Sequence, residues 1–155
     1  MGAVYLLYFV MAIGAAALIG RTPAALSNAA NLIANAGYIV VTLLLYQLFN
    51  PVSRNLAVLA VAISVVGCVI QSLSLFHLVP VQSSLPVFGL FNLTIAILIL
   101  KSTFLPRGLG VVMAISGLGW LTVLSPELLK HIGTYVEILG IAAEGSLMLC
   151  CSSWA

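Results

Sequence analysis

Long runs of apolar residues recur along the whole length of this 155-residue chain and leave few charged side chains between them. Hydrophobic residues make up 63% of the sequence and charged residues only 5%. Because a soluble domain carries about 25% charged residues, this chain could not cover a surface that faces water. Apolar runs of about 18 or more residues are typical of helices that cross a bilayer. The sequence therefore predicts an all-α, polytopic integral membrane helix bundle.

Turn residues divide the apolar runs into six predicted transmembrane helices. Pro51, Pro80, Pro86, Pro106 and Pro126 mark turns or helix starts, where proline is favoured. The connecting turns are too short to hold a soluble domain, so the whole chain, 1–155, is expected to form a single transmembrane domain. The six predicted spans are residues 2–20, 24–49, 55–78, 86–103, 106–124 and 126–151.

Basic residues in the short turns give the predicted orientation. Arg54, Lys101 and Arg107 fall on the side that holds both termini, whereas Arg21 and Lys130 fall on the opposite side. Since short cytoplasmic loops carry the excess of Lys and Arg, both termini are expected to be cytoplasmic. The net charge of +2 is too small and too scattered for a nucleic-acid surface. The predicted partner is therefore the lipid bilayer, and no nucleic acid.

The second span carries a polar face on an otherwise apolar helix. At about 100° per residue, its polar side chains fall within an arc of about 80°. Such an arc is costly against lipid tails, so it is expected to face other helices or a wet cavity. Two interpretations stay open: interhelical hydrogen bonds that hold the bundle together, or the lining of a ligand or water pocket. The polar residues are Asn28, Asn31, Asn35, Tyr38, Thr42 and Tyr46.

Two acidic residues, Glu137 and Glu144, lie well inside the last span and seven residues apart, hence on one helix face. At 1.5 Å per residue, Glu137 lies about 16 Å from the start of its span, near the bilayer centre. An ionised carboxylate is costly there, so Glu137 is expected to be neutral, hydrogen-bonded or beside water. Either a structural hydrogen bond to a neighbouring helix or a proton-relay or ion-coupling site would account for it.

Two histidines lie near the same, outer end of the predicted bundle: His77 closes the third span and His131 opens the sixth. Histidines at similar depth could ligate a metal ion, a haem or a chlorophyll magnesium, or they could contact lipid headgroups. The sequence shows no zinc-protease, catalytic-triad or nucleotide-binding pattern. A non-enzymatic protein is therefore expected, and no cofactor is specified.

Three motifs resemble those of a known family. They are Phe104-Leu105-Pro106-Arg107-x-Leu109-Gly110-Val111, Gly117-Leu118-Gly119-Trp120-Leu121 and Ala143-Glu144-Gly145-Ser146-Leu147. In order and spacing they resemble a family of small bacterial multi-spanning proteins catalogued as domain of unknown function number forty-three eighty-six. The turn at 50–57 and Phe88-Gly89-Leu90 are similar to the same family. The resemblance implies an all-helical protein of the bacterial inner membrane, and it implies no activity or functional residues.

Arg107 and Glu144 fall inside these motifs. If the fifth and sixth spans are antiparallel neighbours, both residues lie near the inner headgroups. The guanidinium of Arg107 could then bind the carboxylate of Glu144. The sequence therefore predicts an ion pair that ties the start of the fifth span to the end of the sixth.

The expected function is that of an integral inner-membrane protein whose polar interior serves structure or binds something small. One alternative is an accessory subunit packed on a larger respiratory or photosynthetic membrane complex. The other alternative is a small proton- or ion-coupled carrier that uses Glu137. Because six spans are few for a monomeric carrier, such a carrier would be expected to form a homo-oligomer. The predicted polar interior consists of Asn28, Asn31, Asn35, Asn92, Glu137 and Glu144.

Overall fold

The computed structural model describes residues 2–18 and 23–152, and helices make up nearly all of this part of the chain. Two short 3-10 turns, Val81–Ser83 and Thr122–Leu124, connect neighbouring helices, and no strand occurs in the described residues. The predicted all-α bundle is confirmed. The α-helices are α1 (Gly2–Leu18), α2 (Ala24–Phe49), α3 (Arg54–Leu75), α4 (Leu85–Lys101), α5 (Arg107–Leu121) and α6 (Pro126–Ser152).

Each predicted span corresponds to one helix, but the helices differ in apolar length. Four contain segments long and apolar enough to cross a membrane, whereas the apolar parts of α1 and α4, Ala3–Ala15 and Leu85–Lys101, are shorter. Such helices indicate a membrane-embedded protein. The four longer segments are Ala25–Phe49, Arg54–Leu75, Arg107–Leu124 and His131–Cys151.

Helix α3 ends at Leu75, three residues before the predicted end of its span, because the chain turns out of the helix there. The N–H of His77 donates to the carbonyl of Ser74 (3.0 Å), and the N–H of Leu78 donates to that of Leu73 (3.2 Å). These two bonds form a Schellman motif, which needs a left-handed residue just past the helix. His77 takes that conformation, with φ 58°.

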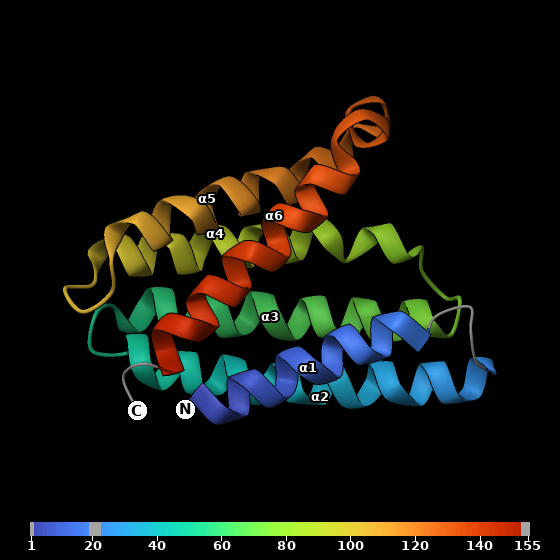
Figure 1. Ribbon diagram of the computed structural model, residues 1–155, viewed down its shortest axis with the longest axis horizontal. Coiled ribbons are helices and arrows are strands. Elements are labelled where there is room, and N and C mark those ends of the chain that lie inside the picture. Colours follow the sequence, from blue (N-terminus) through green and yellow to red (C-terminus); the bar gives the residue numbers. More distant parts are fainter. Residues whose placement is uncertain (1, 19–22, 153–155) are drawn as a thin grey trace.

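Helices that follow one another in the chain run up and down and contact each other (Figure 1), and α6 also contacts α1. The described helices therefore enclose a common interior. Helix α6 crosses the bundle at a slant, so that it leaves α5 and approaches α1 along its length (Figure 1). Its first turns project beyond α5, on the side of the bundle away from α1 and α2 (Figure 1).

Helices α4 and α5 approach closely because glycines face each other. A Cβ atom on Gly89 would lie 2.9 Å from the carbonyl oxygen of Gly117. A Cβ atom on Gly110 would lie 2.8 Å from the side chain of Leu100. Small residues at helix contacts let backbones pack in lipid, where no hydrophobic driving force joins the helices. Close packing against α4 thus gives Gly110 and Gly117 of the α5 motifs a structural role.

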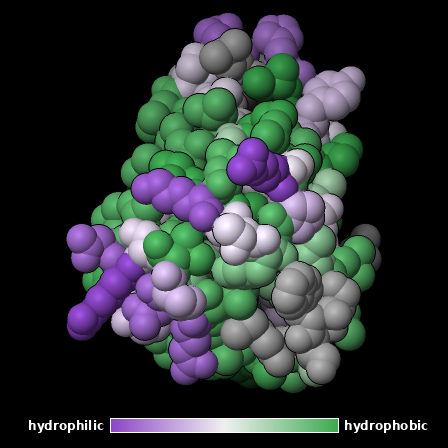
Figure 2. All heavy atoms as spheres, turned by 90° about the vertical axis from the view of Figure 1, so that its left-hand side faces the viewer, coloured by the Kyte–Doolittle hydropathy of each residue, from purple (hydrophilic) through white to green (hydrophobic). Residues whose placement is uncertain are grey.

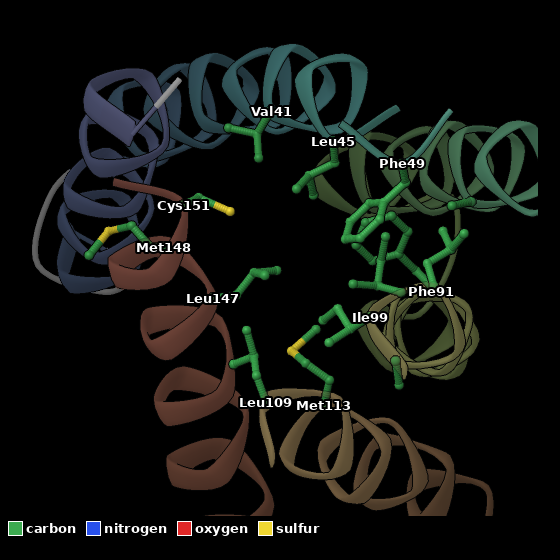
Figure 3. Close-up of a cluster of buried hydrophobic side chains, with 14 of the residues drawn as sticks. Val41, Leu45, Phe49, Phe91, Ile99, Leu109, Met113, Leu147, Met148 and Cys151 are labelled. Carbon is green, nitrogen blue, oxygen red and sulfur yellow. The ribbon is translucent and has the colours of Figure 1, made fainter. Parts of the chain in front are cut away.

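The apolar core fills the half of the bundle that lies towards the start of α1 and the end of α6. Side chains from α2, α4, α5 and α6 point towards one another there (Figure 3). Phe49, Leu98 and Ile99 are completely buried. This half of the interior is therefore closed by packed apolar side chains. The labelled members are Val41, Leu45, Phe49, Phe91, Ile99, Leu109, Met113, Leu147, Met148 and Cys151.

Hydrophilic residues gather on the end of the molecule that carries both chain ends and the α2–α3 and α4–α5 turns. Figure 2 looks onto this end and shows hydrophilic groups within a largely hydrophobic surface. Arg54, Lys101 and Arg107 lie at these turns, and all three are exposed. A basic end beside an apolar surface suits the boundary between bilayer and water.

Candidate functional site

A cavity of about 300 Å³ lies inside the bundle, in the half away from the apolar core. We call it the inner cavity. Every α-helix contributes to its wall, and the segment just before α4 adds Ser84. Its lining residues are Tyr8 and Ala12 of α1, Asn31, Ala34, Asn35 and Tyr38 of α2, Gln71 of α3, Ser84, Leu85 and Phe88 at the start of α4, Trp120 of α5 and Glu144 of α6.

The polar face of α2 serves both roles that the sequence left open. Part of it forms hydrogen bonds to α3, which join the two helices where lipid would leave polar groups unsatisfied. Another part, Asn31, Asn35 and Tyr38, lines the inner cavity. The bonds to α3 are Asn28 Nδ2 to Leu75 O (3.3 Å), Asn35 Nδ2 to Ser72 Oγ (3.2 Å) and Thr42 Oγ1 with Ser64 Oγ (2.8 Å).

Two asparagines of this face, Asn31 and Asn35, line the cavity and have partly used amide groups. The side-chain nitrogen of Asn31 donates to the carbonyl oxygen of Ser27 (2.9 Å), and that of Asn35 donates to Ser72. Each of these nitrogens carries two N–H groups and uses one of them within the protein. No described residue donates a hydrogen bond to either Oδ1, so each amide keeps a donor and an acceptor for a bound molecule.

Aromatic rings form a continuous part of the cavity wall. The rings of Tyr8 and Tyr38 lie 5.3 Å apart between centroids, and those of Tyr38 and Phe88 lie 5.4 Å apart in an edge-to-face arrangement. Trp120 adds an indole from α5. Neither tyrosine hydroxyl forms a hydrogen bond with another residue in the described part of the chain. The wall therefore offers both apolar surface and polar atoms.

Glu144 is the acidic residue of the inner cavity and lies deep in its helix. It is half-buried, and its carboxylate forms no hydrogen bond or ion pair with any described residue. The candidate membrane span of α6 is His131–Cys151, in which Glu144 lies about 20 Å from one end and about 10 Å from the other at 1.5 Å per residue. A carboxylate at this depth is a candidate functional group.

Glu137 lies six residues into the candidate span His131–Cys151, or about 9 Å from its start at 1.5 Å per residue. The residue is exposed and lines a second cavity of about 360 Å³ near the α5–α6 connection, which we call the end cavity. Leu85 and Trp120 line both cavities. The rest of the end cavity is lined by Gln82, Val123, Gly133, Thr134, Val136 and Glu137.

The predicted ion pair between Arg107 and Glu144 is wrong. Arg107 is the exposed first residue of α5, whereas Glu144 shares a cavity with Trp120 near the other end of that helix. Arg107 and Trp120 are 13 residues apart, or about 20 Å along α5. The slant of α6 carries its second half away from α5 and towards α1 (Figure 1), so the two helices are neighbours over only part of their length.

Asn92 belongs to the buried interior but lines neither cavity. It is 1% exposed and its Nδ2 donates to Ser116 Oγ at 3.4 Å, across the α4–α5 contact. Its Oδ1 accepts no hydrogen bond from a described residue. Asn28 likewise serves the contact between α2 and α3. Of the six predicted interior residues, the structure brings Asn31, Asn35 and Glu144 together in the inner cavity.

The two histidines, His77 and His131, are both exposed. The position of His77 is explained by the turn that ends α3. No group of three or more His, Cys, Asp or Glu side chains comes together within residues 2–18 and 23–152. The metal or cofactor role predicted for the histidines gains no geometric support from this arrangement.

Sequence reasoning missed Tyr8, Phe88 and Gln71 as parts of the site. A signal was present for Tyr8, because Tyr5 and Tyr8 are the residues of α1 with side-chain hydroxyls and lie three positions apart on one face. Gln71 and Phe88 carried no comparable signal. They reach the cavity because α3 ends and α4 begins beside it.

No known protein family, curated protein or solved structure matches this chain. The molecule is thus defined by its own geometry, as a membrane-type helical bundle with a polar cavity in one half and a packed apolar core in the other.

Proposed function

We propose that this protein is a non-enzymatic binding protein of the membrane and that its inner cavity holds one small molecule. The observation that carries this proposal is the convergence of side chains from all the described helices on one cavity. Purely structural polar groups are normally satisfied by one another inside a bundle. Here the carboxylate of Glu144 and the hydroxyls of Tyr8 and Tyr38 meet at a cavity without bonding to described residues.

The cavity has the size and wall chemistry of a ligand site. Ligand pockets have volumes of about 300–1,000 Å³ and combine a mostly apolar wall with a few polar groups. The inner cavity lies at the lower limit of this range, at about 300 Å³. Ala12, Ala34 and Leu85 supply apolar surface between its polar groups. A small molecule therefore fits this site better than a lipid or a peptide.

The chemistry of the wall favours binding over catalysis. Its described residues include a single carboxylate, from Glu144, and no histidine, cysteine or second acid. Acid–base and nucleophilic mechanisms usually need two such groups within hydrogen-bond reach of each other. A single carboxylate can still hold and orient a bound molecule.

The proposal includes the bacterial inner membrane as the location, with both termini in the cytoplasm. The exposed basic residues Arg54, Lys101 and Arg107 support this orientation, since they lie at the end that carries both chain ends. The resemblance of the 104–111, 117–121 and 143–147 motifs to a bacterial membrane family supports the location. The inner cavity would then lie towards the periplasmic side.

The end cavity favours a second candidate function, that of a small proton- or ion-coupled carrier. Glu137 lines the end cavity and Glu144 lines the inner cavity, and Leu85 and Trp120 belong to both walls. A movement of the Trp120 side chain would join the two spaces. A proton or a ligand could then pass between two carboxylates on the same face of α6.

Native mass spectrometry of the protein, purified from its membranes into lipid nanodiscs, tests the proposal. We expect the wild-type protein to carry a bound small molecule, and Ala34→Phe to lose it because the new ring fills the inner cavity. The control is Ala29→Phe, an exposed position on the same helix, which should keep the molecule. Equal adducts in all three proteins, or none in any, would contradict the proposal. Stoichiometric larger subunits in the preparation would favour the accessory-subunit alternative.

A further inference from the structure

We propose that the ligand of the inner cavity is a small amphipathic amine, with its ammonium group at Glu144 and its apolar body among the aromatic rings. This inference rests on the proposed binding function and names the chemical class that the site would accept. Three independent properties of the wall lead to it: its charge, its hydrogen-bonding atoms and its aromatic surface.

The charge of the wall disfavours an anionic ligand and favours a cation. Glu144 is the only residue with a charged side chain among the described residues that line the inner cavity, and no Lys, Arg or His accompanies it. A carboxylate away from water is costly unless a positive group accompanies it. Since the protein supplies no such group here, a cationic ligand would provide it. A carboxylate or phosphate ligand would meet an acid with no basic residue to offset the repulsion.

The hydrogen-bonding atoms of the wall can accept from a ligand that donates. The side-chain nitrogens of Asn31 and Asn35 each use one N–H for Ser27 and Ser72, and no described residue donates to their amide oxygens. The carboxylate of Glu144 accepts as well. A primary ammonium group carries three N–H donors, so it can use acceptors of this kind together. A quaternary ammonium ion has no N–H and would leave them unused.

The aromatic surface explains why an organic cation suits the site better than a metal ion. Tyr8, Tyr38, Phe88 and Trp120 all line the cavity, and the first three form a connected cluster with centroid separations of 5.3 and 5.4 Å. Rings of this kind attract cations by their faces and also cover apolar groups. A hard metal ion prefers about six oxygen ligands and gains little from such rings. An amine with an apolar body would contact the polar groups of the wall with its ammonium group and the aromatic rings with its apolar body.

A matched set of compounds tests this inference on the purified full-length protein in nanodiscs. Phenylethylamine, phenylethanol and phenylpropionate have the same ring and differ in being cationic, neutral and anionic. Calorimetric titration should give an affinity for the amine at least about tenfold higher than for the alcohol, and the lowest affinity for the anion. Glu144→Gln should remove the preference for the amine and leave the affinity for the alcohol unchanged.

Two further variants distinguish the effect of the charge at position 144 from an effect on folding. Glu144→Asp retains the charge and should retain the preference for the amine, whereas Glu137→Gln removes the carboxylate of the end cavity and should leave all three affinities unchanged. If the alcohol or the anion binds as well as the amine, in a manner that Ala34→Phe abolishes, the amine class is wrong and the binding function stands. If none of the three compounds binds and no native adduct depends on Ala34, both proposals are wrong.

Discussion

His77 occupies the position just past α3 that glycine takes in most helices that end in this way. Its backbone φ of 58° is left-handed, and a side chain in that region crowds the following carbonyl. Histidine tolerates this conformation better than most residues, but still at a cost of roughly 1–2 kcal/mol. The backbone hydrogen bonds of the turn to Ser74 and Leu73 hold the residue there.

Replacing His77 with glycine should therefore stabilise the protein. We expect His77→Gly to raise the free energy of unfolding by up to about 1 kcal/mol, because relief of the left-handed strain exceeds the added freedom of the unfolded chain. Reversible unfolding in mixed micelles measures the change. The control is His131→Gly, an exposed position inside α6, which should lower stability by about 1 kcal/mol. A clear loss with His77→Gly would instead indicate that the imidazole binds something.

At the scale of whole helices, the contact between α4 and α5 depends on two glycines that leave no room for a side chain. A Cβ atom on Gly117 would lie 2.9 Å from the carbonyl oxygen of Gly89 and 3.0 Å from the backbone nitrogen of Leu93. Backbone atoms cannot rotate away as a side chain can. Any larger residue at position 117 must push the two helices apart.

Gly117→Ala should consequently destabilise the bundle by about 1–3 kcal/mol, the usual cost of overpacking. Gly108 offers a matched control on the same helix, because a Cβ atom there meets nothing within 4 Å. Gly108→Ala should leave stability unchanged or raise it slightly, since alanine favours helix over glycine. Thermal unfolding of both variants in detergent gives the comparison. Equal effects of the two substitutions would mean that the helices are not in such close contact in the membrane.

Helix positions followed from the sequence more directly than helix contacts did. Apolar runs and proline turns predicted every helix to within a few residues, and the arc on α2 predicted that Asn35 and Tyr38 would be inside. The pairing of Arg107 with Glu144 failed because it assumed that α5 and α6 are parallel along their whole length. Hydropathy carries no information on such a slant, which depends on how side chains of several helices pack. The cavity residues Gln71 and Phe88 were missed because hydropathy does not show that the end of α3 and the start of α4 lie beside the cavity.

For the molecule as a whole, the basic end predicts the way in which the chain is threaded. A fluorescent protein fused to the C-terminus should be fluorescent, and alkaline phosphatase at the same point should be inactive, because both would lie in the cytoplasm. Phosphatase inserted in the 78–84 loop, at the opposite end of the bundle, should be active. An active C-terminal phosphatase would reverse the orientation and place the inner cavity towards the cytoplasm.

The interior is divided into a polar half and an apolar half, so the inner cavity is closed at one end and does not run through the bundle. Asn31, Asn35 and Glu144 lie at the cavity, whereas Phe49, Leu98 and Ile99 close the other half without exposed surface. A cavity that opens at this end alone would equilibrate with one compartment, and the occupancy of the proposed ligand would report its concentration on that side of the membrane. A gradient across the bilayer cannot drive a flow through this conformation. Transport would require the packed side chains of α2 and α4 to separate, and their close packing opposes that step.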